Sequence, residues 1–125
     1  MENEIVMASG SIGKIEEAQE ILNQYKIISM MNLGIKMEVE EDQDTFRGNA
    51  IKKAETIAKL LEGRKCLADD SGIEIEYLNG FPGVYTKRWF EGTDRERNLA
   101  IIKKLEGISK ENRKIKFITA MAISD

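Results

Sequence analysis

Two short polar segments carry side chains that could take part in chemistry. Their sequences are Ser9-Gly10-Ser11-Ile12-Gly13-Lys14 and Asp69-Asp70-Ser71-Gly72. In the first, two hydroxyls and an ammonium offer hydrogen-bond donors to phosphate oxygens. In the second, adjacent carboxylates are suited to binding a hard cation or accepting a proton. Taken alone, each segment also fits an ordinary turn, because Gly, Ser and Asp are favoured there for backbone reasons.

The first segment is not a Walker A loop, because only Ser11 and Ile12 separate its glycines and Ile15 follows Lys14. It does stand where a loop opens a predicted helix. Backbone N–H groups and the positive end of the helix dipole favour an anion at such a place. The segment is therefore a candidate phosphate-binding loop.

An acidic patch supplies further carboxylates. Its members are Glu38, Glu40, Glu41, Asp42 and Asp44. Most of them are expected to form a solvated loop, but one could complete a magnesium site, since Mg²⁺ takes one or two carboxylates together with phosphate oxygens and waters. The chain has no histidine and one cysteine, so oxygen atoms are the metal ligands it can offer. A phosphate loop with carboxylates and Mg²⁺ indicates chemistry on phosphoric anhydrides.

Composition excludes several other classes. Without histidine there is no Ser-His-Asp or Cys-His triad and no His-ligated zinc. Cys66 lies in an apolar run and is expected to be a core residue. Lys and Arg total 19 and Asp and Glu total 22, so the net charge of −3 gives no basic footprint for nucleic acid.

No segment indicates export or membrane insertion. The N-terminus is acidic, and the apolar run that follows it covers only residues 5–8. No apolar stretch approaches the roughly 20 residues that span a bilayer. We therefore expect a cytoplasmic protein without a membrane partner.

The first half of the chain predicts alternating strands and helices. Residues 5–8 and 26–31 are short apolar runs typical of strands. Two segments show the helical spacing of apolar residues. The apolar positions of the first are Ile15, Ala18, Ile21, Leu22 and Tyr25. Those of the second are Phe46, Ala50, Ala54, Ile57, Ala58 and Leu61. A third buried strand, 66–68, ends at Asp69. Ligands bind beyond the carboxyl ends of strands in open α/β sheets, so loop 9–14 and Asp69-Asp70 are expected at one rim, with one aspartate turned away by alternation.

The second half predicts a further strand, a helix and a final strand. Residues 73–77 alternate as in a half-buried strand and precede a turn at Asn79-Gly80. Thr93 and Glu96 form a capping-box pattern before a helix that buries Leu99, Ile102 and Leu105 and runs to about Gly107. Residues 115–123 are apolar on both faces apart from Thr119, as in a central strand.

These elements indicate one α/β domain over residues 1–125, with a mixed sheet flanked by helices. The chain stops two residues after a strand that needs covering layers on both faces. We therefore expect it to be cut short or completed by a partner, with a second copy as the commonest solution.

Four segments, taken in order, resemble the inosine triphosphatase (Ham1-like) family of nucleoside triphosphate pyrophosphatases. They are residues 8–14, Glu40-Glu41 with Thr45-Phe46 and 49–54, residues 68–72, and residues 80–88. The resemblance covers essentially all of this chain but only about the first two thirds of a typical member. It implies an elongated α/β fold, here incomplete at the C-terminus, a homodimer, and Mg²⁺-dependent cleavage of ITP, dITP or XTP to the monophosphate and pyrophosphate.

The resemblance also implies roles for individual residues. Asp70 would bind Mg²⁺ together with Glu41 and would orient or deprotonate the attacking water. The substrate would be held by Ser9, Gly10, Ser11, Ile12, Gly13, Lys14, Lys53, Ser71 and Arg88. Because Lys14 is expected to be exposed, its replacement by Ala should weaken triphosphate binding and leave the melting temperature almost unchanged.

The chain departs from the family pattern at three places. Ser11 replaces an Asn, Gly48 stands where many members have Glu, and the later Gly-Phe-Gly-Tyr-Asp-Pro and Ser-His-Arg segments have no counterpart. Since those segments recognise the base, we expect triphosphate affinity without base discrimination, and low turnover. Two alternatives stay open, a weakly active or non-catalytic nucleotide-binding remnant and an oligomerising scaffold.

Overall fold

The computed structural model describes residues 3–125, which form two compact units. The first unit holds the chain up to Asp70 together with Ala120–Asp125, and the second holds Ser71–Thr119. The prediction of a single domain over residues 1–125 stays a prediction.

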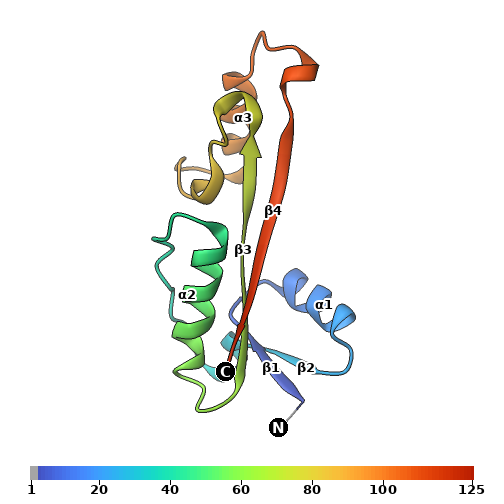
Figure 1. Ribbon diagram of the computed structural model, residues 1–125, viewed down its shortest axis with the longest axis vertical. Coiled ribbons are helices and arrows are strands. Elements are labelled where there is room, and N and C mark those ends of the chain that lie inside the picture. Colours follow the sequence, from blue (N-terminus) through green and yellow to red (C-terminus); the bar gives the residue numbers. More distant parts are fainter. Residues whose placement is uncertain (1–2) are drawn as a thin grey trace. The chain divides into compact units, whose positions relative to one another are not determined.

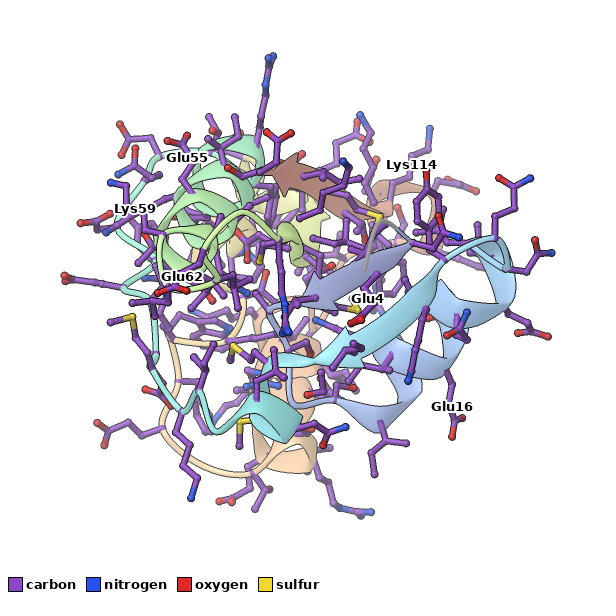
Figure 2. The ribbon with its side chains drawn as sticks, turned by 90° about the horizontal axis from the view of Figure 1, so that it is seen from below. Glu4, Glu16, Glu55, Lys59, Glu62 and Lys114 are labelled. Atoms are coloured by element: carbon purple, nitrogen blue, oxygen red, sulfur yellow. The ribbon has the colours of Figure 1, made fainter. Side chains whose placement is uncertain are left out.

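The first unit contains three parallel strands and two helices. Strands β1 (Glu4–Met7) and β2 (Lys26–Ser29) pair in parallel, and β1 also pairs in parallel with the start of β3 (Lys65–Ile75). Helices α1 (Ile12–Ile21) and α2 (Phe46–Ala58) lie on opposite sides of β1 and β2 (Figures 1 and 2). The strands predicted at 5–8 and 26–31 and both helices are thus confirmed, although a 3-10 helix begins at Met30.

Alternation along the strands divides the core of this unit into two layers. One layer joins α2 to the sheet and includes Val6, Ala8, Ala54, Ile57, Ala58, Leu61, Cys66 and Ala68. The other joins α1 to the sheet and includes Ile5, Met7, Ala18, Ile27 and Leu67. Successive residues of a strand point to opposite faces, so a strand covered on both sides must be apolar throughout. Ile21 takes no part, because it is 76% exposed.

Strand β3 is longer than the sequence indicated. The chain was expected to leave the sheet at 69–72 and start a new strand at 73, but one strand runs from Lys65 to Ile75. Tyr77 falls in a short 3-10 helix, and Asn79, with φ of 55°, ends it. Asn79-Gly80 is a turn, as predicted.

The second unit also contains α3 (Asp94–Lys104) and the start of β4 (Ile115–Ser124). The predicted capping box is confirmed, since Thr93 Oγ1 accepts from the Glu96 N–H and the Glu96 carboxylate accepts from the Thr93 N–H. The buried face of α3 differs in part from the predicted one. Leu105, which follows α3, is buried as predicted and packs with Ile101 against Ile75. Leu99 and Ile102 are more than half exposed, so their predicted burial is wrong.

Strand β4 is an edge strand, which corrects the prediction of a central one. The sheet order is β2-β1-β3-β4. Ser71 is hydrogen-bonded to Thr119, and Glu76, further along the chain, is hydrogen-bonded to the earlier residue Lys114. Strand β4 is therefore antiparallel to β3. The Phe117 side chain on this strand is 87% exposed. The predicted α/β class with a mixed sheet is confirmed. The sheet is mixed because β1, β2 and β3 are parallel and β4 is antiparallel to β3. No helix within residues 3–125 is long and apolar enough to cross a membrane.

The buried thiol of Cys66 generates the first testable prediction. Its side chain is fully buried, and burial raises the pKa of the thiol to about 11, with Lys53 acting weakly in the opposite direction. Because the thiolate is the nucleophile, the folded protein should react with a thiol reagent far more slowly than the unfolded protein. Absorbance after addition of a disulfide reagent measures this. A Ser109→Cys variant, at an exposed site, provides a rapidly labelled control, and equally rapid labelling of native Cys66 would contradict the packing described.

Candidate functional site

The loop at residues 9–14 follows the carboxyl end of β1, and hydrogen bonds to the side chains of Ser9 and Ser11 stabilise it. The Ser29 hydroxyl donates to the carbonyl oxygen of Ser9 over 2.9 Å, which ties the loop to the end of β2. The Ser11 N–H donates to Ser9 Oγ over 3.1 Å. Ser11 caps α1 by accepting from the Lys14 N–H over 3.4 Å. The Ser in place of the family's Asn is therefore a helix cap in this chain.

The remaining loop residues leave the helix start open to solvent. Gly10 and Gly13 are exposed, and Ile12 is 74% exposed although it is the first residue of α1. A Cβ at Gly10 would lie 3.4 Å from Met31 Cγ. The free N–H groups of the first helical turn and the dipole of α1 thus face solvent, as an anion site requires.

Asp69 contacts the ammonium groups of two lysines, Lys14 and Lys53. It is 4% exposed and lies on the α1 side of β3, where its Oδ2 is 2.9 Å from Lys14 Nζ. Its backbone carbonyl accepts a hydrogen bond of 2.9 Å from Lys53 Nζ, which comes from α2. One buried residue therefore positions Lys14 through its side chain and Lys53 through its backbone.

The ion pair changes what is expected of Lys14. The sequence indicated an exposed lysine without a structural role, but its side chain is 34% exposed and paired with a buried carboxylate. Removing one partner of a buried pair is destabilising, because the other charge loses its compensation. The expectation that Lys14→Ala leaves the melting temperature unchanged is therefore replaced by an expected loss of stability.

Asp70 points to the opposite side of β3, towards α2 and the acidic loop. It is 4% exposed, and its Oδ2 accepts from Asn49 Nδ2 over 3.0 Å. Burial raises the pKa of its carboxyl, and the charge and hydrogen bond of the Glu41 side chain raise it further, against the lowering effect of Asn49 and Lys53. Glu41 and Asp70 thus interact directly, and the cation site that they were predicted to share stays a prediction.

The donor set around Asp70 fits Mg²⁺. Two carboxylates of like charge are held together, and a divalent cation would relieve their repulsion. Within residues 3–125 no group of three or more His, Cys, Asp or Glu side chains is placed to hold a metal. Water and phosphate oxygens would complete the coordination, which is how Mg²⁺ is usually bound in proteins.

The other predicted residues of the acidic patch behave as a solvated loop. Glu38, Glu40 and Asp44 are exposed. Asp42 Oδ1 forms a surface ion pair of 2.7 Å with Lys52 Nζ.

Two predicted substrate contacts, Ser71 and Arg88, belong to the second unit. Ser71 Oγ is 3.0 Å from Thr119 Oγ1. Arg88 Nη2 donates to the Val84 carbonyl over 2.8 Å, and its guanidinium lies 5.3 Å from the ring centroid of Tyr85. The first unit alone brings together loop 9–14, Lys53, Glu41 and Asp70.

Sequence reasoning missed Asn49 as part of this site. Its side chain is 1% exposed and bonded at both ends, to Asp70 and to the Gln43 N–H. A signal was available, because Asn49 falls at helical spacing from Phe46 on the face that is otherwise apolar. A polar residue on a buried helix face needs a hydrogen-bond partner.

The raised pKa of Asp70 predicts a pH-dependent effect on stability. Folding disfavours its ionised form, so the cost is absent below the carboxyl pKa of the unfolded chain and grows as pH rises through the folded pKa. Asp70→Asn should therefore raise the melting temperature at about pH 8, with a smaller gain near about pH 4. Thermal unfolding in metal-free buffer measures the change, and Asp44→Asn is the exposed control. A lower melting temperature for Asp70→Asn at the higher pH would contradict the assignment.

This chain is similar to proteins of one known family. Residues 5–125 match the model of the Ham1 family. Curated relatives include the dITP/XTP pyrophosphatases of Clostridium tetani, 38% identical over 125 residues, and Bacillus licheniformis, 40% identical over 124. These alignments cover 95% and 96% of this chain but 61% and 63% of the relatives, so the chain spans about three fifths of their length.

Solved structures give the same result. A Ham1 protein from Coxiella burnetii superposes with a TM-score of 0.85 at 37% identity, covering 96% of this chain and 62% of that one. The Staphylococcus aureus Ham1 protein gives a TM-score of 0.84 at 36% identity, covering 97% and 62%. The resemblance inferred from the sequence is thereby confirmed, and the chain belongs to the Ham1 family.

Proposed function

We propose that this chain takes part in the Mg²⁺-dependent hydrolysis of non-canonical purine nucleoside triphosphates, ITP, dITP and XTP, to the monophosphate and pyrophosphate. The observation that carries the proposal is the gathering of three features at the carboxyl end of β1 and at residues 69–70 of β3, just beyond the residues that pair with β1. They are the open N-terminus of α1, two ammonium groups and a carboxylate pair. The names of the relatives, dITP/XTP pyrophosphatase, support the choice of substrate.

Lys14, Lys53 and the loop are suited to holding a triphosphate. Each ammonium has three donors, and Asp69 takes one from each lysine, so further donors are left for phosphate oxygens. The N–H groups at the start of α1 add uncharged donors beside them. We assign substrate contacts to Ser9, Gly10, Ser11, Ile12, Gly13, Lys14 and Lys53 in the first unit, and to Ser71 and Arg88 in the second.

Glu41 and Asp70 are suited to the reaction centre. Both would hold the Mg²⁺, which when bound supplies positive charge that neutralises phosphate oxygens. Asp70 would also orient the attacking water and accept its proton.

The setting of the reaction is also part of the proposal. We infer a cytoplasmic protein and a homodimer. Support for association comes from the exposed apolar side chains of edge strand β4, including Phe117 and Met121.

Pyrophosphate release from ITP by the 125-residue chain tests the proposal. We expect release that requires Mg²⁺ and falls by about 100-fold or more in Asp70→Asn, which cannot accept a proton and is a poorer cation ligand. Asp44→Asn, an exposed member of the same acidic patch, should retain the wild-type rate. Running the assay with ATP as well measures the predicted loss of base discrimination.

Two other outcomes are informative. Equal release by wild type and Asp70→Asn would contradict the proposed site. Mg²⁺-dependent binding of ITP without release of pyrophosphate would favour the nucleotide-binding remnant over an active enzyme.

A further inference from the structure

Asn49 links the two carboxylates of the candidate cation site from inside the fold. Its Nδ2 donates to Asp70 Oδ2 over 3.0 Å, and its Oδ1 accepts from the Gln43 N–H over 2.9 Å. Gln43 stands two residues after Glu41. One buried amide therefore connects the strand that carries Asp70 to the loop that carries Glu41.

The loop that carries Glu41 has no regular structure of its own. Residues 35–45 lie between the 3-10 helix that ends at Leu33 and the start of α2, and none is in a helix or strand. Such a segment keeps a defined position only through side-chain and packing contacts. Ile35 and Val39 pack on the α2 layer of the core, before Glu41. After Glu41, the contacts to α2 include the Asn49 hydrogen bond and the exposed Asp42–Lys52 pair.

The Asn49 contact is the stronger of these two tethers. An exposed ion pair contributes little, because water and salt screen it. A hydrogen bond made by a side chain that is 1% exposed cannot be replaced by water without opening the core. Gly48 allows the loop to come this close, since a Cβ at position 48 would lie 3.0 Å from Gln43 Cβ.

The amide is also matched to its two partners. The Gln43 N–H can only donate and therefore takes the Asn49 oxygen, and an ionised Asp70 can only accept and therefore takes the nitrogen. The amide orientation is thus fixed, and Asp70 keeps its other oxygen for a cation. Without this bridge, repulsion between the Glu41 and Asp70 carboxylates would drive the loop away from β3.

We propose that Asn49 is a positioning residue that holds Glu41 and Asp70 together as a preformed site for a divalent cation. The inference deepens the proposed function and rests on it, because it concerns the same carboxylate pair. It adds a residue that touches neither cation nor phosphate and acts through Asp70 and the Gln43 backbone.

Mg²⁺ affinity of the full 125-residue chain, measured by isothermal titration calorimetry without nucleotide, tests the inference. Asn49→Ala should weaken Mg²⁺ binding by about 10-fold or more, as is typical when a partner of a metal ligand is removed. Two control variants should stay within about 2-fold of wild type, because they leave the bridge intact. Lys52→Ala removes the exposed tether of the loop, and Thr56→Val removes a hydrogen bond of the same helix to the Lys52 carbonyl.

Nuclear magnetic resonance of the wild type gives a readout that does not depend on how well Asn49→Ala folds. The Gln43 amide hydrogen should exchange more slowly than those of Asp42 and Asp44, its neighbours in the irregular loop. Addition of Mg²⁺ should shift the side-chain amide resonances of Asn49. In Asp70→Asn that shift should disappear.

The outcomes separate this inference from the proposed function. Unchanged Mg²⁺ affinity in folded Asn49→Ala overturns the positioning role and leaves the carboxylate site standing. A similar loss of affinity in Thr56→Val overturns it too, since any weakening of α2 would then suffice. Wild-type protein that binds no Mg²⁺, or binds it equally well as Asp70→Asn, overturns the cation site and the inference with it. If Asn49→Ala does not fold, the wild-type spectrum decides: side-chain amide resonances of Asn49 that do not shift on addition of Mg²⁺ would contradict the inference.

Discussion

Burial of two consecutive aspartates in β3 is the constraint on which the rest of the site depends. Asp69 and Asp70 are each 4% exposed, and because they are neighbours in a strand they face opposite sides of the sheet. A buried carboxylate is tolerated only with a charged or hydrogen-bonding partner. Each side of the sheet must therefore supply its own partner, and each helix supplies one, Lys14 from α1 and Asn49 from α2.

The placement of both helices follows from this requirement together with apolar burial. Helix α1 packs its apolar face on one layer of the core. It must also start at a position from which Lys14 reaches Asp69, and this determines where loop 9–14 turns. Helix α2 covers the other layer, and its Asn49 and Lys53 are directed at residues 69–70 of β3. The same contacts that satisfy the buried carboxylates therefore gather the positive and negative groups of the proposed reaction at one rim.

Local patterns predicted much of this arrangement. The strand, loop and helix order of the first unit and the Thr93 capping box were both visible in residue types and spacing. Each depends on periodicity or on chemistry carried by a short motif. The family resemblance fixed the identity of the carboxylates, since the acidic patch by itself does not distinguish Glu41 from its neighbours.

What the sequence did not predict depends on contacts between residues far apart in the chain. The Lys14–Asp69 ion pair joins residues separated by 55 positions, and the Asn49–Asp70 bond joins residues separated by 21. β3 continues past Asp70 because its polar residues find partners there, so turn-favouring Asp, Ser and Gly do not end it. β4 is apolar in sequence yet lies at the sheet edge, since apolar character does not reveal which neighbours a strand has.

A double-mutant cycle on Lys14 and Asp69 tests most directly whether the buried carboxylates require their partners. The free energy of unfolding is measured by denaturant titration for wild type, Lys14→Ala, Asp69→Asn and the double variant. Each single change leaves one charge without its counterpart, whereas the double variant removes both charges. The loss of unfolding free energy in the double variant should therefore be smaller than the sum of the two single losses by about 1 kcal/mol or more. The partial exposure of Lys14 keeps this expectation modest. Losses that add within about 0.5 kcal/mol would show that burial of Asp69 does not depend on Lys14 and would contradict the account.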